Sequence, residues 1–515
     1  MKSLQATALR RWVMLRALAW ACACGTASAW EYGIMIDAGS GGSRLHFYRW
    51  PTRIADPMQP LYGAITEPEE LFSITTRPGI SSFAHNASQV LPYMRALLAE
   101  ARGRLASMRQ QWYLIPIYLK ATAGARNLFQ DQRDDIFAHI RDALASSEFR
   151  FDSHYWARTI SGEEEGVYAW LTVNAIKGTF RSKTGEDTWG ALDMGGASTQ
   201  IAFIPKDISI IQNYYPLHLS YIHEHMYTHS FLEFGYRDAN QRVIRRLIKF
   251  GAGNGTRSSP VMNPCYKRGV LFKQNFSDTF SINHQPRWVR GTGKLSKCVE
   301  IAAELLKPNA RCYVPAISRE FAVDSREGAC SINGIYQPLV EKRKFAAMGQ
   351  YAKQAKKLGL PLDIIIPMSK WMDALEKHCD DEHWEDFCWR SIWLGTLIVR
   401  GLRFPLDTEQ IMFTSVLDGK DTGWALGAMM NEVNYYPWRA SDNSPFTLTA
   451  ANSSADGDGG AADVEGHPGG AAGSATTVVA ASVTGALGLG VGWTAALSWA
   501  ARQRLGDHSE PLLPA

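Results

Sequence analysis

Two segments of the chain follow the same design, and their similarity constrains the fold more than any other feature. Residues 32–50 consist of an apolar run that ends at Asp37, a turn rich in Gly and Ser, and a second apolar run. Residues 190–204 repeat this design with Asp193 in the equivalent place. Each segment predicts a strand, a turn and a second strand. Because the two aspartates lie 156 positions apart (193 − 37), the segments predict two similar domains that face each other across a cleft.

The two turns are suited to bind phosphate groups. Glycine tolerates unusual backbone angles and has no side chain to block a ligand, so successive N–H groups can converge on an anion. One such turn is most often only a tight turn, but two facing copies would hold a polyphosphate from both sides. The residues predicted to contact phosphate are Ser40, Gly41, Gly42, Ser43 and Arg44 in the first turn, and Gly195, Gly196 and Ala197 in the second. The preceding aspartates would hold a cation or its water shell.

A third segment fits the same cleft. Residues 113–120 predict an apolar strand that leads into residues 121–126, a turn of small residues ending in a cation. One interpretation is that Thr122 only caps the helix that follows. The functional alternative is that its hydroxyl contacts the water of a bound metal, while Arg126 lies near phosphate.

Three consecutive carboxylates, Glu163, Glu164 and Glu165, stand at a predicted helix start. Acidic residues are common at this position because they interact favourably with the helix dipole. A site that hydrolyses phosphate esters, however, needs a base that orients and deprotonates water. The segment therefore predicts either an ordinary helix start or the source of a catalytic base.

Composition and motifs exclude several other classes of protein. With 46% apolar and 20% charged residues, the chain is neither wholly disordered nor collagen-like. Its 54 basic and 50 acidic side chains leave a net charge of +4, which does not favour nucleic acid as a partner. Lys294 is followed by Leu295, so the sequence contains no Walker loop. His223, His225 and His229 lack the His-Glu-x-x-His spacing of a zinc site, and we interpret them as helix-surface or core histidines.

Residues 1–29 indicate a secretory signal peptide. Basic residues precede a short apolar run, and small residues at the end predict cleavage after Ala29. The apolar run is shorter than the roughly 20 residues that span a bilayer. The alternative is an uncleaved anchor that begins near Trp12, which would place Arg16 inside the membrane.

A single membrane span is predicted near the C-terminus. Residues 478–501 contain no charged residue, and as a helix they would reach about 36 Å, enough to cross a lipid bilayer. The basic start of residues 502–515 favours a cytosolic tail and hence a type I membrane protein. Residues 441–477 are rich in Gly, Ala, Ser and Asp and predict a flexible stalk. Gly488 and Gly492 have the spacing for close helix contact, so a homo-oligomer is one expectation.

The cysteine count agrees with a secreted chain. Two of the eight cysteines lie in the signal peptide, and the remaining even number predicts three disulfides with fifteen possible connectivities. The six are Cys265, Cys298, Cys312, Cys330, Cys379 and Cys388. Four Asn-x-Ser/Thr patterns predict glycosylation, at Asn86, Asn254, Asn275 and Asn452.

Five motifs, taken in order, resemble the conserved regions of the apyrase family of nucleoside triphosphate diphosphohydrolases. They lie at residues 36–44, 121–126, 160–170, 191–200 and 423–427. The likeness extends from about residue 32 to residue 431. It implies hydrolysis of nucleoside tri- and diphosphates with Ca²⁺ or Mg²⁺ as the cofactor.

The resemblance also implies the architecture. The expected fold is α/β and actin-like, with two ribonuclease-H-like domains and the active site in the cleft between them. Residues 30–160, completed by a returning segment at 418–440, would form the first domain. Residues 161–417 would form the second domain.

Individual roles follow from the same resemblance. Glu165 matches the family's catalytic base, and Ser198 and Gln200 match positions near the attacking water. Glu163 is not expected to be essential. The residues that would hold the metal through water are Asp37, Asp193, Thr122 and Trp424. Phe345 and Tyr351 are candidates to stack on the nucleobase. The implied disulfides join Cys265 to Cys298, Cys312 to Cys330, and Cys379 to Cys388.

Residues 40–44 and 290–293 resemble the lumenal branch of this family, found in the Golgi or lysosome, more than its cell-surface branch. The sequence leaves open whether the catalytic domain lies in the Golgi lumen, in the endo-lysosomal lumen or at the cell surface. In each case the domain would be on the lumenal or extracellular side of the membrane.

The predicted reaction is attack of water on the terminal phosphorus, in line with the leaving group and without a covalent intermediate. A sugar kinase or related phosphotransferase on the same fold is the first alternative. It would need an acceptor pocket and normally a cytosolic location, which the secretory features oppose. A non-catalytic nucleotide-binding membrane protein is the second alternative, and the presence of Glu165 and Trp424 opposes it.

Overall fold

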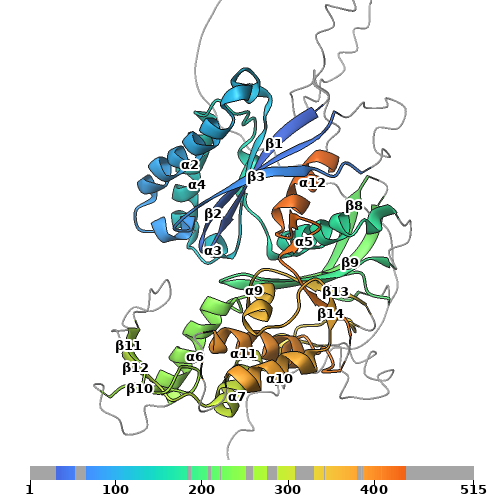
Figure 1. The fold of residues 1–515 in the computed structure, drawn as a ribbon. Coiled ribbons are helices and arrows are strands. Elements are labelled where there is room, and N and C mark those ends of the chain that lie inside the picture. The colour runs from blue at the N-terminus through green and yellow to red at the C-terminus, as the bar shows by residue number, and fades with distance from the viewer. Residues whose placement is uncertain are drawn as a thin grey trace, which may run out of the picture. The chain divides into compact units, whose positions relative to one another are not determined.

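The computed structural model describes residues 30–52, 65–181, 187–206, 210–220, 222–250, 259–274, 287–307, 330–340, 343–379, 384, 387–407 and 409–435. In these residues two mixed β-sheets carry the main helices (Figure 1). A smaller three-stranded sheet and a two-stranded ladder complete the strands of this part of the chain.

The first sheet has the strand order β3-β2-β1-β4-β5. Its strands are β1 (Trp30–Gly39), β2 (Gly42–Pro51), β3 (Glu69–Thr76), β4 (Ile117–Ala121) and β5 (Ala157–Thr159). β1 and β2 form the predicted hairpin, in which Gly39 pairs with Gly42. β4 runs parallel to β1, so the turn after β4 lies beside the turn after β1.

Strand β1 is apolar on both faces because a separate core packs on each face. Ile34 and Ile36 lie in a cluster with side chains of α2 (Val90–Arg104) and α4 (Gln130–Ala145). Met35 points to the opposite face, since side chains alternate along a strand. There it joins residues of α5 (Gly162–Ile176) and α12 (Ala425–Tyr435). Short helices in this half of the chain are η1 (Ile80–Phe83), η2 (Ala87–Gln89), η3 (Ala106–Leu114), α3 (Ala123–Arg126), η4 (His154–Trp156) and η5 (Thr179–Arg181).

The second sheet has the strand order β14-β15-β13-β6-β7-β9-β8. Its strands are β6 (Gly190–Met194), β7 (Ser198–Phe203), β8 (Tyr214–Leu219), β9 (Ile222–Leu232), β13 (Phe345–Ala347), β14 (Ile365–Ile366) and β15 (Ile411–Phe413). β6 and β7 form the second predicted hairpin, in which Met194 pairs with Thr199. Both sheets therefore contain one hairpin of the same design.

Helices cover both faces of the second sheet. Ala191 and Ala202 pack with α5 and α12, whereas Leu192 and Phe203 belong to the core on the opposite face. The helices of that second core are α6 (Tyr236–Phe250), α7 (Leu295–Leu306), α9 (Gln350–Lys357), α10 (Met368–His378) and α11 (Cys388–Thr396), with η7 (Ile332–Gly334) and the π-helix η8 (Leu397–Gly401). α12 packs against both α5 and β1. The exact domain boundaries stay a prediction.

The smaller sheet has the order β10-β12-β11 and lies beside α6 and α7 (Figure 1). Its strands are β10 (Val261–Asn263), β11 (Leu271–Gln274) and β12 (Arg287–Gly291), and the two-stranded ladder pairs β16 (Val416–Leu417) with β17 (Lys420–Asp421). A disulfide joins Cys265 to Cys298, and another joins Cys379 to Cys388. Cys330 is disulfide-bonded as well; its expected partner, Cys312, lies outside the described residues.

Two local expectations differ from the structure. The strand predicted over residues 113–120 begins only at Ile117. The residues before it form η3, where the Trp112 indole N–H donates to the Leu105 carbonyl oxygen at 2.9 Å and holds the chain in tight turns. His223, His225 and His229 lie on strand β9 and not on a helix.

Several predicted segments lie outside the described residues. These are the signal peptide 1–29, the stalk 441–477, the span 478–501, the tail 502–515, and the glycosylation sites Asn254, Asn275 and Asn452. Asn86 is described and its side chain is exposed. No helix among the described residues is both long enough and apolar enough to cross a membrane.

Candidate active site between the two turns

The two glycine-rich turns approach each other closely. The Arg237 guanidinium, at the start of α6, donates from Nη2 to Ser40 Oγ of the first turn at 2.6 Å. A Cβ atom on Gly196 of the second turn would lie 2.5 Å from this guanidinium and 2.8 Å from Ser40 Oγ. Glycine at position 196 therefore allows the turns to meet around one cation. Gly41 also faces Arg237, since a Cβ there would lie 3.7 Å from it.

The other predicted phosphate-binding residues lie on the same two hairpins. Ser43 is fully buried on β2, so its hydroxyl does not reach the surface of the turn. Arg44 lies beside it, and its guanidinium is 3.6 Å from the Asp421 carboxylate. Gly195 donates its backbone N–H to the Ser198 carbonyl oxygen at 3.0 Å, which closes the second turn around Ala197.

Asp37 and Asp193 occupy the strand end before each turn, and each is half-buried. Burial raises the pKa of Asp37 to about 6, against the opposing charges of His46 and Arg44. Burial raises the pKa of Asp193 to about 7, and the charges of Glu165 and Asp37 add to this effect. The two aspartates therefore repel each other across a shared space, so a cation between them would relieve this repulsion.

This pair fits a divalent cation. Asp37 Oδ1 is buried and has no hydrogen-bond partner among the described residues. Carboxylate and hydroxyl oxygens are the ligands that Ca²⁺ and Mg²⁺ prefer. Thr122 lies next to the first strand end, because its N–H donates to the Ala38 carbonyl oxygen at 3.2 Å. Within the described residues, no cluster of three or more His, Cys, Asp or Glu side chains could hold a metal ion.

Trp424 differs from the other expected metal residues. Its indole is buried and packs against Tyr168, with ring centroids 6.4 Å apart. The neighbouring Gly423 N–H donates to Asp421 Oδ1 at 2.6 Å. The Trp424 ring therefore supports the helix that carries Glu165, whereas Asp421 and its charge lie near Asp37.

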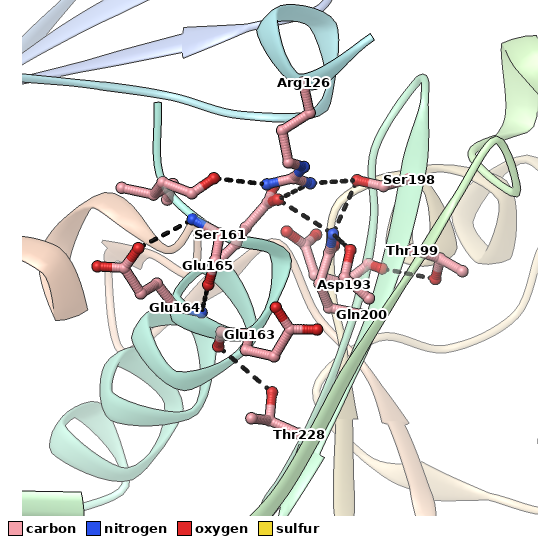
Figure 2. Close-up of polar contacts among 12 residues, drawn as sticks. Arg126, Ser161, Glu163, Glu164, Glu165, Asp193, Ser198, Thr199, Gln200 and Thr228 are labelled. Carbon is pink, nitrogen blue, oxygen red and sulfur yellow. Dashed lines mark hydrogen bonds and ion pairs between the residues drawn. The ribbon is translucent and has the colours of Figure 1, made fainter. Parts of the chain in front are cut away.

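Glu165, Ser198 and Gln200 form one hydrogen-bonded cluster (Figure 2). The Gln200 amide nitrogen lies 3.0 Å from Glu165 Oε2 and 2.7 Å from Ser198 Oγ. Arg126 joins the cluster from α3, and its Nη2 donates to Glu165 Oε2 at 2.7 Å and to Ser198 Oγ at 3.3 Å. The structure thus brings Glu165 of α5 next to Ser198 and Gln200 of β7.

The start of α5 gives each of its three carboxylates a different environment. Glu164 and Ser161 form a reciprocal cap, in which each side chain accepts the backbone N–H of the other residue. Both terminal nitrogens of the Arg158 guanidinium, Nη1 and Nη2, donate hydrogen bonds to the Glu164 carboxylate. Glu163 is half-exposed, with 41% of its side chain accessible, whereas Glu165 is buried. Glu165 is therefore the carboxylate of this helix start that reaches the cluster.

Burial raises the pKa of Glu165, and the charge and hydrogen bond of Arg126 oppose this shift. For Glu164, burial alone would raise the pKa. The hydrogen bond and charge of Arg158 outweigh burial, so that the pKa of Glu164 lies below its usual value. A carboxylate with a raised pKa is a better base near neutral pH than an ordinary one.

The two residues expected to stack on the nucleobase do not lie on an accessible surface. Phe345 is fully buried and packs edge-on against Phe203 and Phe404. Tyr351 is fully buried as well, and its hydroxyl lies 3.3 Å from the Thr199 hydroxyl. This expectation is corrected, because both rings are part of the core under the second sheet and leave no face for a base.

A cavity of about 400 Å³ instead opens beside Arg237. The described residues that line it combine aromatic rings with cations, and none of these residues is a carboxylate. The lining residues are Tyr236, Arg237, Asn240, Cys265, Tyr266, Lys267, Val270, Phe272, Trp384, Trp389 and Arg390.

The sequence motifs did not reveal all of these participants. Arg126 was expected near phosphate, but its ion pair with Glu165 is visible only in the structure. Arg237 lies outside the five motifs, and nothing in its local sequence distinguishes it from the other cations of α6. Ser230, whose hydroxyl lies 2.8 Å from the Gln200 amide nitrogen, comes from β9 and was also missed.

Comparison with known proteins agrees with this site. Residues 25–445 match the GDA1/CD39 (nucleoside phosphatase) family. Ectonucleoside triphosphate diphosphohydrolase 1 of Bos taurus is 28% identical over 449 residues, which are 79% of this chain and 82% of that protein. Ectonucleoside triphosphate diphosphohydrolase 3 of Homo sapiens is 27% identical over 448 residues, which are 79% of each chain.

A solved structure is similar in fold. It is the crystal structure of nucleoside triphosphate hydrolases from Neospora caninum, with a TM-score of 0.59, 17% sequence identity, and coverage of 79% of this chain and 93% of that chain. The fold is thus the expected α/β, actin-like fold. The family match and the named relatives identify the chain as a phosphohydrolase of the apyrase type. The chain belongs to the GDA1/CD39 (nucleoside phosphatase) family.

Proposed function

We propose that this protein releases the terminal phosphate of nucleoside tri- and diphosphates in a reaction that depends on a divalent cation. The relatives named above are triphosphate diphosphohydrolases by name. The observation that carries the proposal is the cluster of Glu165, Ser198 and Gln200 beside the two glycine-rich turns.

The backbone N–H groups of the two turns and the Arg237 guanidinium would bind the phosphates. Phosphoryl transfer depends mainly on positioning and on stabilising charge, which a site of this composition supplies. Asp37 and Asp193 would hold Ca²⁺ or Mg²⁺, whose positive charge neutralises the phosphate oxygens. Ser198 and Gln200 would orient the attacking water, and Glu165 would accept its proton.

Arg126 would also contribute to this mechanism. Its guanidinium is paired with Glu165 in the structure without substrate, at 2.7 Å. A phosphate group competes strongly for such a guanidinium. When Arg126 turns to phosphate, Glu165 loses the charge that lowers its pKa and becomes a stronger base. Substrate binding would thus activate the base.

The nucleoside would occupy the cavity beside Arg237, because that residue also contacts the first phosphate turn. Aromatic walls such as those of Tyr266 and Trp389 suit a planar base. This location replaces the expectation for Phe345 and Tyr351.

Replacement of the base tests the proposal. We expect Glu165→Gln in the full chain to lower kcat by about 10²–10⁴-fold, the usual contribution of a general base. Glu163→Gln, two positions earlier and half-exposed, is the matched control and should retain the kcat of the unmodified protein. Phosphate release is measured without any sugar acceptor, with EDTA and then with Ca²⁺ or Mg²⁺ restored. Near-normal turnover by a folded Glu165→Gln variant would contradict the assignment.

We also propose that residues 478–501 anchor the protein in a membrane with the catalytic part on the lumenal or extracellular side. The support is the uncharged length of this run and the basic residues after it. The test is protease treatment of sealed microsomes, followed by detection of tags on the tail and near residue 440. Protection of the tail, with loss of the other tag, would contradict the orientation.

A further inference from the structure

The smaller sheet and the helices beside it are strongly basic. The described residues 236–250, 259–274 and 287–307 contain thirteen Lys or Arg and three Asp or Glu. The whole chain is nearly balanced, with 54 basic and 50 acidic side chains. The excess positive charge of the protein is therefore concentrated in this one lobe.

One face of the smaller sheet is made of exposed apolar and cationic side chains. The exposed apolar side chains are Met262, Leu271 and Trp288, with 54%, 45% and 48% of their surface accessible. Lys273 and Arg290 are the exposed cations between them. We call these five residues the outer face.

Strand register makes the outer face continuous. Lys273 on β11 pairs with Trp288 on β12, and Leu271 pairs with Arg290. Arg290 also pairs with Met262 on β10. Paired residues on neighbouring strands point to the same side of a sheet, so the five side chains are neighbours. No carboxylate belongs to this face.

The inner face of the same sheet is occupied. Val261 and Val289 are buried there, and Phe272 lines the cavity beside Arg237. The outer face is thus not a second side of the nucleotide site.

This combination fits the surface of an anionic bilayer. Trp prefers the interface between hydrocarbon and water, and Lys and Arg are attracted to anionic headgroups. A soluble polyanion would account for the cations, but it would not account for the exposure of Met262, Leu271 and Trp288. The charge-free run at residues 478–501 gives the same chain a reason to remain close to a bilayer.

We propose that the outer face docks onto the surface of a membrane that contains anionic phospholipid. Trp288, Leu271 and Met262 enter the headgroup region, while Lys273 and Arg290 contact the phosphates and carboxylates of the lipids. This function is separate from nucleotide hydrolysis, and it holds the catalytic part against the bilayer.

The test uses the full chain reconstituted into bilayer discs of phosphatidylcholine, with or without phosphatidylserine. Amide hydrogen exchange is measured on peptides that cover β11 and β12. We expect exchange to slow by about fivefold or more in the discs with phosphatidylserine, the effect of roughly one cation near an anionic surface. Trp288 fluorescence, taken as the difference from Trp288→Phe, should be quenched by brominated lipid in the same discs.

Variants identify the residues responsible. The double variant Lys273→Glu/Arg290→Glu should lose the difference between the two kinds of disc. Arg95→Glu/Lys356→Glu makes the same change of charge at exposed positions of α2 and α9 and should keep that difference. All these variants should hydrolyse nucleotide in detergent at the rate of the unmodified protein, which shows that they are folded.

Three results would overturn the proposal. Exchange in β11 and β12 could be equal in both kinds of disc, or the charge-reversed variant could retain the difference. Protection could also arise without lipid, either with soluble heparin or with rising protein concentration. Those last outcomes would identify a soluble polyanion or a second copy of the chain as the partner instead.

Discussion

The two strand–turn–strand segments share a design but differ in their surroundings. Asp37 in the first has His46 and Arg44 nearby, and its pKa is about 6. Asp193 in the second faces the charges of Glu165 and Asp37, and its pKa is about 7. The strand after the second turn carries Ser198 and Gln200, which contact the proposed base. Under the proposed function both turns would bind phosphate, whereas the activation of water would depend on the strand after the second turn.

In the comparison of the two turns, the largest expected effect on kcat/KM comes from removing the charge of either aspartate. We expect Asp193→Asn and Asp37→Asn each to lower kcat/KM by about 10²–10³-fold, as removal of a charge-stabilising group in a closed site does. Excess Mg²⁺ or Ca²⁺ should partly rescue Asp37→Asn, because Asp193 still provides an anionic ligand. Nucleotide titrations over a range of metal concentrations measure this. Equal metal dependence of both variants and the unmodified protein would show that neither aspartate holds the ion.

Arg126 joins α3 to Glu165 and Ser198, and its removal should change the pH profile. Glu165 must be deprotonated to act as a base, and Arg126 lowers its pKa. In Arg126→Gln the pKa of Glu165 in the free enzyme should therefore rise, so the acid limb of the kcat/KM profile, which reports the free enzyme, shifts to higher pH. Loss of a charged hydrogen bond to phosphate should also raise KM by about tenfold or more. An unchanged acid limb would mean that another group controls it.

The pair of Arg158 and Glu164 should matter for stability more than for chemistry. Glu164→Gln weakens a partly buried ion pair and a helix cap, which we expect to lower the free energy of unfolding by about 1–3 kcal/mol. Because α5 carries Glu165, a smaller fall in kcat should accompany this loss. Glu163→Gln is the control and should change stability by less than about 0.5 kcal/mol. Urea denaturation followed by circular dichroism measures the difference, and equal stability of the two variants would contradict the role of the cap.

The smallest expected effect is a difference between the two aspartates in how they make the stability depend on pH. Without metal, the folded protein keeps these groups protonated up to about pH 6 and about pH 7, whereas the usual value is 3.8. The folded state thus binds more protons in this window, and its stability falls as pH rises through it. Asp193→Asn should flatten this dependence over a wider pH range than Asp37→Asn. Denaturation in EDTA at several pH values measures how the stability of each variant depends on pH. A steeper pH dependence in Asp193→Asn than in Asp37→Asn would contradict this prediction.

Much of the fold could be predicted from the sequence because it depends on local patterns. The two hairpins have apolar runs on each side of a glycine turn, and the structure contains both hairpins. The helix with three acidic residues begins at Gly162, so the carboxylates lie in its first turn, as expected. The strand expected over residues 113–120 was placed too early, since the hydrogen bond of the Trp112 indole is not a local pattern.

The candidate site was predictable only in part. Motifs identified Glu165, Ser198 and Gln200, but they did not show that Arg126 pairs with the proposed base. Phe345 was misjudged because an aromatic residue looks the same in a sequence whether its ring is buried or exposed. Burial depends on Phe203 and Phe404, which come from distant strands and loops.

By itself the sequence determined the repeated hairpins, the family and the residues at the strand ends, because backbone preferences and glycine turns act over a few neighbouring positions. The tertiary structure decided which of three adjacent carboxylates is buried, and it brought Arg237 to Ser40 across the chain. It also gathered exposed apolar and cationic side chains on one face of the smaller sheet. These features depend on packing between elements that are distant in sequence, and so they exist only once the chain has folded.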